Sequence, residues 1–181
     1  MRLLIVGYGK MGQMVEQLAA DRQIEIAGRV DAGHGDWTAA DVVTHIVTGM
    51  NGLTAGLTGG EPAAVGEGDP VATWNAAREA TLAAISTADL TTNVNGPFGP
   101  MPAAQVIGRF MSTDMLVHTW DLARAVGGDE ALDQDTVAAA YSGLKPMDAM
   151  IRQPGVFGPK IEPAEGDDLQ TEFLKFLGRN V

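Results

Sequence analysis

The stretch STDMLVHTWDLARAVGG, residues 112–128, decides how the fold is interpreted. It closes the longest helical pattern of the chain, which we expect to run from Ala103 to Val126 and to end at Gly127-Gly128. Asp114 and His118 lie one turn apart in this helix, so their side chains point the same way. The apolar side, on or beside which the pair would lie, is predicted to consist of Phe110, Met111, Met115, Leu122 and Val126.

A buried Asp–His pair needs partners, because an unpartnered buried carboxylate would cost roughly several kcal/mol. A mutual hydrogen bond, water or a metal ion would each satisfy it. A third candidate is His45, on a helix that Thr38 can cap and whose apolar stripe begins at Val42. If the two helices face each other, His45, Asp114 and His118 converge, and two imidazoles with one carboxylate suit Zn²⁺ or a similar divalent ion. A structural histidine and a helix-surface pair are the alternatives.

The rest of the chain after residue 36 also predicts mainly α structure. We expect a glycine-rich loop with a short helix at residues 51–69, then a helix that Asp69 and Pro70 begin. Its predicted apolar face consists of Val71, Trp74, Leu82 and Ile85. LTTNV, residues 90–94, predicts a short strand. Two further helices are expected after the capping residues Asp133 and Asp168, to about Leu144 and Leu177, the second ending at Gly178.

The N-terminus predicts a different structure, a β-α-β fragment of the Rossmann type. Residues 3–6 and 25–30 are expected to be strands, with a helix at residues 10–21 between them. Gly7, Gly9 and Gly12 form G-x-G-x-x-G, a loop that lets the backbone approach a pyrophosphate, and Asp31 ends the second strand. Beyond residue 31 no strands alternate with helices, so the sheet that such a site needs is missing. We therefore interpret these four residues as a vestigial cofactor site and do not expect NAD(P) binding.

The composition of the chain argues against several classes of function. The 181 residues suit one domain, or one domain with a small additional piece. The net charge is −11 and the twelve Lys and Arg residues are scattered, which argues against nucleic-acid binding. There is no cysteine, so a metal site would use His and carboxylates. No apolar run approaches the length of a signal peptide's apolar region or a membrane span, so a cytoplasmic protein is expected.

Four blocks carry a family resemblance that runs from about residue 35 to residue 181: GDWTAADVVTHIVTGM, NGPFGPMPAAQVI, STDMLVHTWDLARAVGGD and FLKFLGR. They resemble metal-binding proteins related to the N-terminal domain of mycothiol-dependent maleylpyruvate isomerase, in the DinB-like superfamily. The resemblance implies a four-helix bundle with a metal ion held by His45, Asp114 and His118. It also implies thiol-dependent transferase or isomerase chemistry on a small molecule. Since this chain has no cysteine, the thiol would be an external one of low molecular weight.

The chain departs from that family before residue 35. The family begins with a long first bundle helix and a Pro-Cys-x-x-Trp turn, whereas DAGHGDW stands here, with His34 at the usual place of the cysteine. Residues 1–33 resemble instead the opening of dihydrodipicolinate reductase. Gly7, Gly9 and Gly12 match its phosphate loop, and Asp31 falls where an acid would meet the adenine ribose. The resemblances together indicate a chimera of two parts, residues 1–33 and 35–181.

Three hypotheses about function follow. The first is a divalent-metal-binding helical protein, in its finer form a thiol-dependent transferase or isomerase. The second is an NAD(P)-dependent oxidoreductase fragment, and the third a non-enzymatic chimera. Without its first helix the bundle would leave an apolar flank, to be covered by residues 10–21 or by a second chain in a homodimer. Asp121 is interpreted either as a partner of the site or as the cap of a neighbouring segment, and the three tryptophans as core aromatics.

Overall fold

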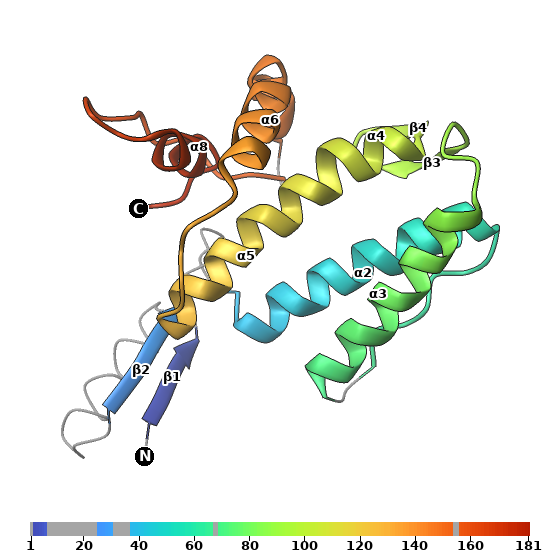
Figure 1. The fold of residues 1–181 in the computed structure, drawn as a ribbon, viewed down its shortest axis with the longest axis horizontal. Coiled ribbons are helices and arrows are strands. Elements are labelled where there is room, and N and C mark those ends of the chain that lie inside the picture. The colour runs from blue at the N-terminus through green and yellow to red at the C-terminus, as the bar shows by residue number, and fades with distance from the viewer. Residues whose placement is uncertain (1, 7–24, 31–36, 67–68, 154–155) are drawn as a thin grey trace. The chain divides into compact units, whose positions relative to one another are not determined.

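The computed structural model of the chain describes residues 2–6, 25–30, 37–66, 69–153 and 156–181 (Figure 1). These residues are mainly helical, which confirms the predicted class. The chain divides into two compact units, of which one contains Ala40–Met115 and the other contains Met1–Ala39 with Leu116–Val181. The division falls inside a single helix, α5. None of the helices in the described ranges is long and apolar enough to cross a membrane.

Two short strands form the N-terminal sheet. β1 (Arg2–Val6) pairs in parallel with β2 (Glu25–Val30), as a β-α-β connection would require. Both strands confirm the sequence prediction, apart from one residue at the start of β1. The other parts of the predicted nucleotide unit lie outside the described residues: Gly7, Gly9, Gly12, the helix at residues 10–21 and Asp31. The Rossmann-like site therefore stays a prediction, as does the domain boundary near residue 34.

The unit made of residues 40–115 is built on two helices, α2 (Ala39–Thr58) and α3 (Pro70–Thr87). α3 begins as predicted, with the Asp69 side chain accepting a hydrogen bond from the Val71 backbone N–H at 3.1 Å. The two helices contact each other where the Thr54 and Thr81 hydroxyl oxygens lie 3.0 Å apart.

The loop predicted from residue 51 begins only after Thr58, because α2 continues to that residue. Leu53 and Ala55 are buried in this added part, so tertiary packing stabilises the helix despite its glycines. Gly56 has a packing role, since a Cβ atom there would lie 3.0 Å from Val94 Cγ1. The missing side chain lets α2 pass close to the segment that contains Val94.

The predicted apolar face of α3 is wrong for two of its four residues, whereas Trp74 and Ile85 are partly buried and Ile85 packs against the core around Leu53. Val71 and Leu82 are 63% and 52% exposed, whereas Ala77, Thr81 and Ala84 are buried. The buried residues are small, and small side chains let two helix backbones approach closely enough for the Thr54–Thr81 contact. Side-chain size rather than hydrophobicity therefore decided which face of α3 packs inward.

A hairpin and a long helical run complete this unit. β3 (Asn93–Gly96) and β4 (Gly99–Pro102) pair antiparallel, so the strand predicted at residues 90–94 begins later and gains a partner. The Ala103 backbone N–H donates to the Thr92 carbonyl at 2.9 Å and joins the hairpin to the helix that follows. Four buried residues form the local core: Leu53, Val94, Ala103 and Val106.

The long helix predicted for residues 103–126 is confirmed, with a change of winding inside it. It comprises α4 (Ala103–Gln105), the π-helical segment η1 (Val106–Met111) and α5 (Ser112–Val126). The Ser112 hydroxyl donates to the Ile107 carbonyl at 2.8 Å, five residues earlier, which matches the wider π turn. The run ends as predicted at Gly127, whose φ of +66° suits a helix C-terminus.

In the other unit, helices α6 (Gln134–Leu144) and α8 (Leu169–Phe176) follow α5 along the chain and pack against each other. Both begin at the predicted caps, because Asp133 accepts from the Thr136 N–H and Asp168 from the Thr171 N–H, each at 2.8 Å. The ring of Tyr141 packs against the rings of two phenylalanines of α8. The short segments η2 (Lys145–Met147) and α7 (Asp148–Ile151) follow α6 directly.

The buried side of α5 differs from the predicted one. Val126, assigned to the apolar side, is 60% exposed, and the other four residues assigned to that side are only half-buried. The buried residues of α5 are Thr113, Val117, His118, Trp120, Asp121 and Ala125. Polar residues occupy the interior here because they bind one another, which no count of apolar positions can show.

Candidate metal centre

Helix α5 presents the first two residues of the candidate site. Asp114 and His118 lie one turn apart on it, as the sequence predicted. The Asp114 side chain is half-buried and the His118 side chain is only 3% exposed. Because α5 is one continuous helix, the spacing of the two residues follows from its regular geometry.

His45 on α2 supplies the third residue. Its Nε2 lies 3.0 Å from Asp114 Oδ2, in a contact inside the unit made of residues 40–115. The two side chains are 43% and 32% exposed. An ionised carboxylate only accepts hydrogen bonds, so the contact pairs it with an N–H at His45 Nε2, and a metal ion would take the place of that proton.

The three predicted ligands are thus brought together. Candidate ligand atoms of His45, Asp114 and His118 all lie within 4.8 Å of one another. On a tetrahedral zinc ion with bonds of about 2.1 Å, two ligand atoms are roughly 3.4 Å apart. The 3.0 Å between His45 Nε2 and Asp114 Oδ2 is close to that separation. The donor set and its spacing therefore fit a divalent ion, although metal binding itself stays a prediction.

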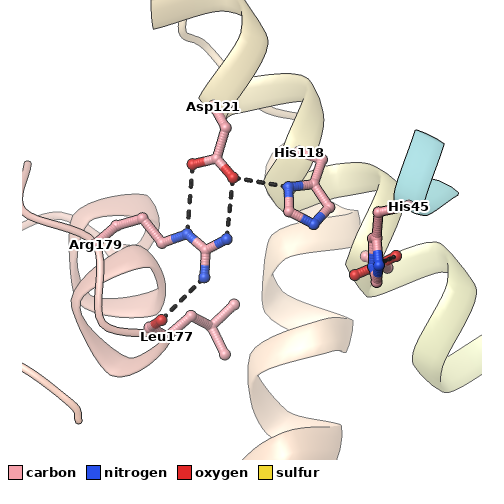
Figure 2. Close-up of polar contacts among 6 residues, drawn as sticks. His45, His118, Asp121, Leu177 and Arg179 are labelled. Carbon is pink, nitrogen blue, oxygen red and sulfur yellow. Dashed lines mark hydrogen bonds and ion pairs between the residues drawn. The ribbon is translucent and has the colours of Figure 1, made fainter. Parts of the chain in front are cut away.

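A network of buried polar side chains binds His118 at its Nδ1 atom (Figure 2). His118 Nδ1 lies 2.8 Å from Asp121 Oδ2, and the guanidinium Nη2 of Arg179 donates to the same oxygen at 3.0 Å. Arg179 also donates through Nε to Asp121 Oδ1 at 3.4 Å and through Nη1 to the Leu177 carbonyl at 3.0 Å. The side chains of His118, Asp121 and Arg179 are each at most 3% exposed.

The carboxylate of Asp121 decides the proton position on His118. Burial by itself raises the pKa of Asp121, but the hydrogen bond from His118 and the charge of Arg179 outweigh burial and lower the pKa below its ordinary value. Ionised Asp121 can only accept, so His118 carries its hydrogen on Nδ1. In the neutral imidazole, Nε2 is then the nitrogen with the lone pair, which is the state that a metal ligand needs.

The structure distinguishes the roles of Asp121 and of the three tryptophans. Asp121 is a partner of the site, which answers the choice that the sequence left open. Trp120 is a core aromatic, at 2% exposure, whereas Trp74 is only half-buried. Trp37 is half-buried and stacks on His118, so it is more than a core residue. The proposed cofactor residues Gly7, Gly9, Gly12 and Asp31, together with His34, lie outside the described residues.

Sequence reasoning missed Arg179. It follows α8 after Gly178, whose φ is +83° and whose added Cβ would lie 2.9 Å from the Pro159 carbonyl oxygen. The only local signal was the glycine before a single arginine in FLKFLGR, and this signal says nothing about a partner 58 residues away in sequence. The tertiary fold alone brings Arg179 to Asp121.

Two proteins of Mycobacterium tuberculosis are similar to the chain. They are uncharacterized protein Rv0738 of strain H37Rv and uncharacterized protein MT0763 of strain CDC 1551. Each is 30% identical over 152 residues, which cover 81% of this chain and 81% of the relative. No protein-family model matches the chain, and no solved structure matches it.

Proposed function

The chain belongs to the family of the mycobacterial proteins Rv0738 and MT0763, and from this premise we propose that it binds a divalent metal ion through His45, Asp114 and His118. The printed names of these relatives assign no activity, so the proposal rests on the chain's own residues. The observation that carries it is the convergence of two imidazoles and one carboxylate within 4.8 Å. This ligand set favours Zn²⁺ among the common divalent ions.

The three residues form a site with one buried side and one side that is open to solvent. His118 is buried and held by Asp121, and a histidine held by a carboxylate in this way is typical of metal ligands. His45 and Asp114 are 43% and 32% exposed, so solvent or a small molecule reaches the cluster at these residues. Three protein ligands leave an open coordination position, which is typical of catalytic rather than structural zinc.

The finer proposal is a four-helix bundle of the DinB type that acts as a thiol-dependent transferase or isomerase. The resemblance of residues 35–181 to that superfamily supports it, together with the mainly helical structure. A bound ion would supply Lewis-acid activation of a group on the substrate or cofactor. The chain's own part would be to orient the ligands and to keep Nε2 of His118 unprotonated. Since the chain has no cysteine, the thiol would come from a small molecule.

Elemental analysis of protein purified without a histidine tag tests the metal proposal. We expect about one zinc or similar ion per chain, because the chain offers one three-residue cluster among its described residues. His118→Ala, Asp114→Ala and His45→Ala should each lose it. Thr48→Ala is the control, since Thr48 is an exposed residue of α2 whose hydroxyl donates to the Thr44 carbonyl of the same helix. Stoichiometric metal in His118→Ala would rule out the site as described.

The oxidoreductase alternative is tested by cofactor titration. We expect neither NADH nor NADPH to bind, because among the described residues the N-terminal sheet consists of β1 and β2 alone, whereas a dinucleotide crevice needs several strands. Fluorescence or calorimetric titration measures this. A micromolar Kd that is lost in Gly9→Ala would contradict the expectation and would favour the oxidoreductase hypothesis.

A further inference from the structure

A tryptophan lies against the buried ligand of the proposed centre. The ring centroids of Trp37 and His118 are 6.0 Å apart, and the planes of the two rings differ by 22°. This is an offset stack, within the range in which aromatic rings attract each other. Both residues belong to the same compact unit.

The stack and the hydrogen bond to Asp121 restrain different motions of the His118 ring. The hydrogen bond at Nδ1 fixes one edge of the ring and its tautomer. It still allows the ring to rock about that edge, and this motion swings Nε2. The indole, offset over the imidazole and nearly parallel to it, opposes such rocking because tilting the ring would weaken the stack.

We propose that Trp37 is a positioning residue, which sets the direction of the His118 Nε2 lone pair toward the metal ion. The proposal rests on the proposed function of the site. Ligand groups of a metal centre must be held within about 10–20° of the productive direction. Asp121 at the edge and Trp37 at the face together restrain His118 in the two directions that matter. Trp37 touches the ligand rather than the ion, so it acts through His118.

The test compares three variants in their binding of Co²⁺, whose visible absorption reports ligand geometry. Trp37→Ala removes the stack, and Trp37→Phe keeps a flat ring at the same place. Trp74→Ala removes the same type of side chain from α3, which contains none of the proposed ligands, and is the matched control. Trp120 is not used as the control because it is buried two residues from His118.

We expect Trp37→Ala to bind Co²⁺ about tenfold more weakly than the wild type, the lower end of the range for residues that support a metal ligand. Its cobalt spectrum should change, and its metal should transfer faster to a chelator. Trp37→Phe should restore the spectrum and most of the affinity. Trp74→Ala should keep both, even if its melting temperature falls. A purely structural role of Trp37 would lower the melting temperature and leave the cobalt spectrum unchanged.

The outcomes separate this proposal from the metal proposal. If the wild type binds Co²⁺ and Trp37→Ala binds it with the same affinity and spectrum, the positioning role is wrong and the metal site stands. The same conclusion follows if Trp74→Ala changes the spectrum as much as Trp37→Ala does. If the wild type binds no cobalt, the metal site and the positioning role both fail. The ring contact is checked separately in metal-free protein, where Trp37→Ala should shift the ring-proton resonances of His118.

Discussion

His118 and His45 are the same side chain in two different settings. His118 is 3% exposed and bound to Asp121, which Arg179 holds in turn. His45 is 43% exposed, and the contact it makes with Asp114 lies near the surface. One histidine is therefore fixed before any metal ion binds, and the other can adjust to it.

The difference in burial between the two histidines gives the two sides of the proposed centre different roles. The buried side supplies a rigid ligand whose tautomer is set in advance, which lowers the entropy lost on binding. The exposed side admits the ion and whatever molecule occupies its open position. Variants on the two sides should therefore fail in different ways: those on the buried side should lose folding stability or metal affinity or both, and those on the exposed side should lose the metal with little change in stability.

The largest effect is expected from Arg179→Met. This change removes the guanidinium from a buried ion pair and leaves Asp121 with one fewer partner, and breaking such a pair typically costs about 3–5 kcal/mol. The free energy of unfolding, measured by urea denaturation of metal-free protein, should fall by about that amount. Exposed Arg78→Met on α3 serves as the control and should change little. An Arg179→Met protein as stable as the wild type would show that the buried side is not rigidly anchored.

Asp121→Asn should weaken metal binding strongly, although the two side chains are nearly the same size. The amide can still accept from His118, but it lacks the charge that favours a proton on Nδ1 and pairs with Arg179. Loss of such a supporting carboxylate typically weakens metal binding by about 10–100-fold. Competition with a chelator measures this, with Asp135→Asn on α6 as the control. Unchanged affinity in Asp121→Asn would mean that the carboxylate only packs.

A smaller loss is expected from Gly178→Ala, which disturbs the turn that delivers Arg179. A left-handed backbone costs an alanine about 1–2 kcal/mol, and its Cβ would meet the Pro159 carbonyl at 2.9 Å. The melting temperature should fall, and metal affinity should fall with it as Arg179 shifts. Gly143→Ala is the control, because nothing lies within 4 Å of a Cβ at that helical position. A loss of stability without any loss of affinity would separate the turn from the metal site.

The smallest effect on stability is expected on the exposed side. In metal-free protein His45→Ala should lower the free energy of unfolding by less than about 1 kcal/mol, because exposed ion pairs contribute little. The same variant should nevertheless lose the metal. Thermal denaturation with and without added zinc measures both quantities. A stability loss as large as that of Arg179→Met would remove the contrast between the two histidines.

The structural features that the sequence predicted are those set by local backbone geometry. The spacing of Asp114 and His118 on one helix follows from helical periodicity, and the caps Asp69, Asp133 and Asp168 follow from backbone hydrogen bonding. His45 was located by its place beside an apolar stripe and by the family resemblance. These features need only a few consecutive residues to be read correctly.

The parts that the sequence did not predict depend on packing between distant segments. The inward face of α3 is made of small residues because α2 lies close, so Val71 and Leu82 were wrongly assigned to it. The burial of Asp121 depends on Arg179, which comes to it from the far end of the chain. No local pattern distinguishes a buried polar residue that has such a partner from a surface residue that has none.

X-ray absorption at the zinc edge tests the central claim most directly. The sample is untagged protein loaded with one zinc ion per chain. We expect nitrogen and oxygen ligands at about 2.0–2.2 Å from the zinc ion, with the outer-shell scattering of two imidazoles. His45→Ala protein, if it retains any zinc, should show one imidazole. A wild-type spectrum without imidazole scattering, or with two imidazoles remaining in His45→Ala, would contradict the assignment of His45, Asp114 and His118 as the metal ligands.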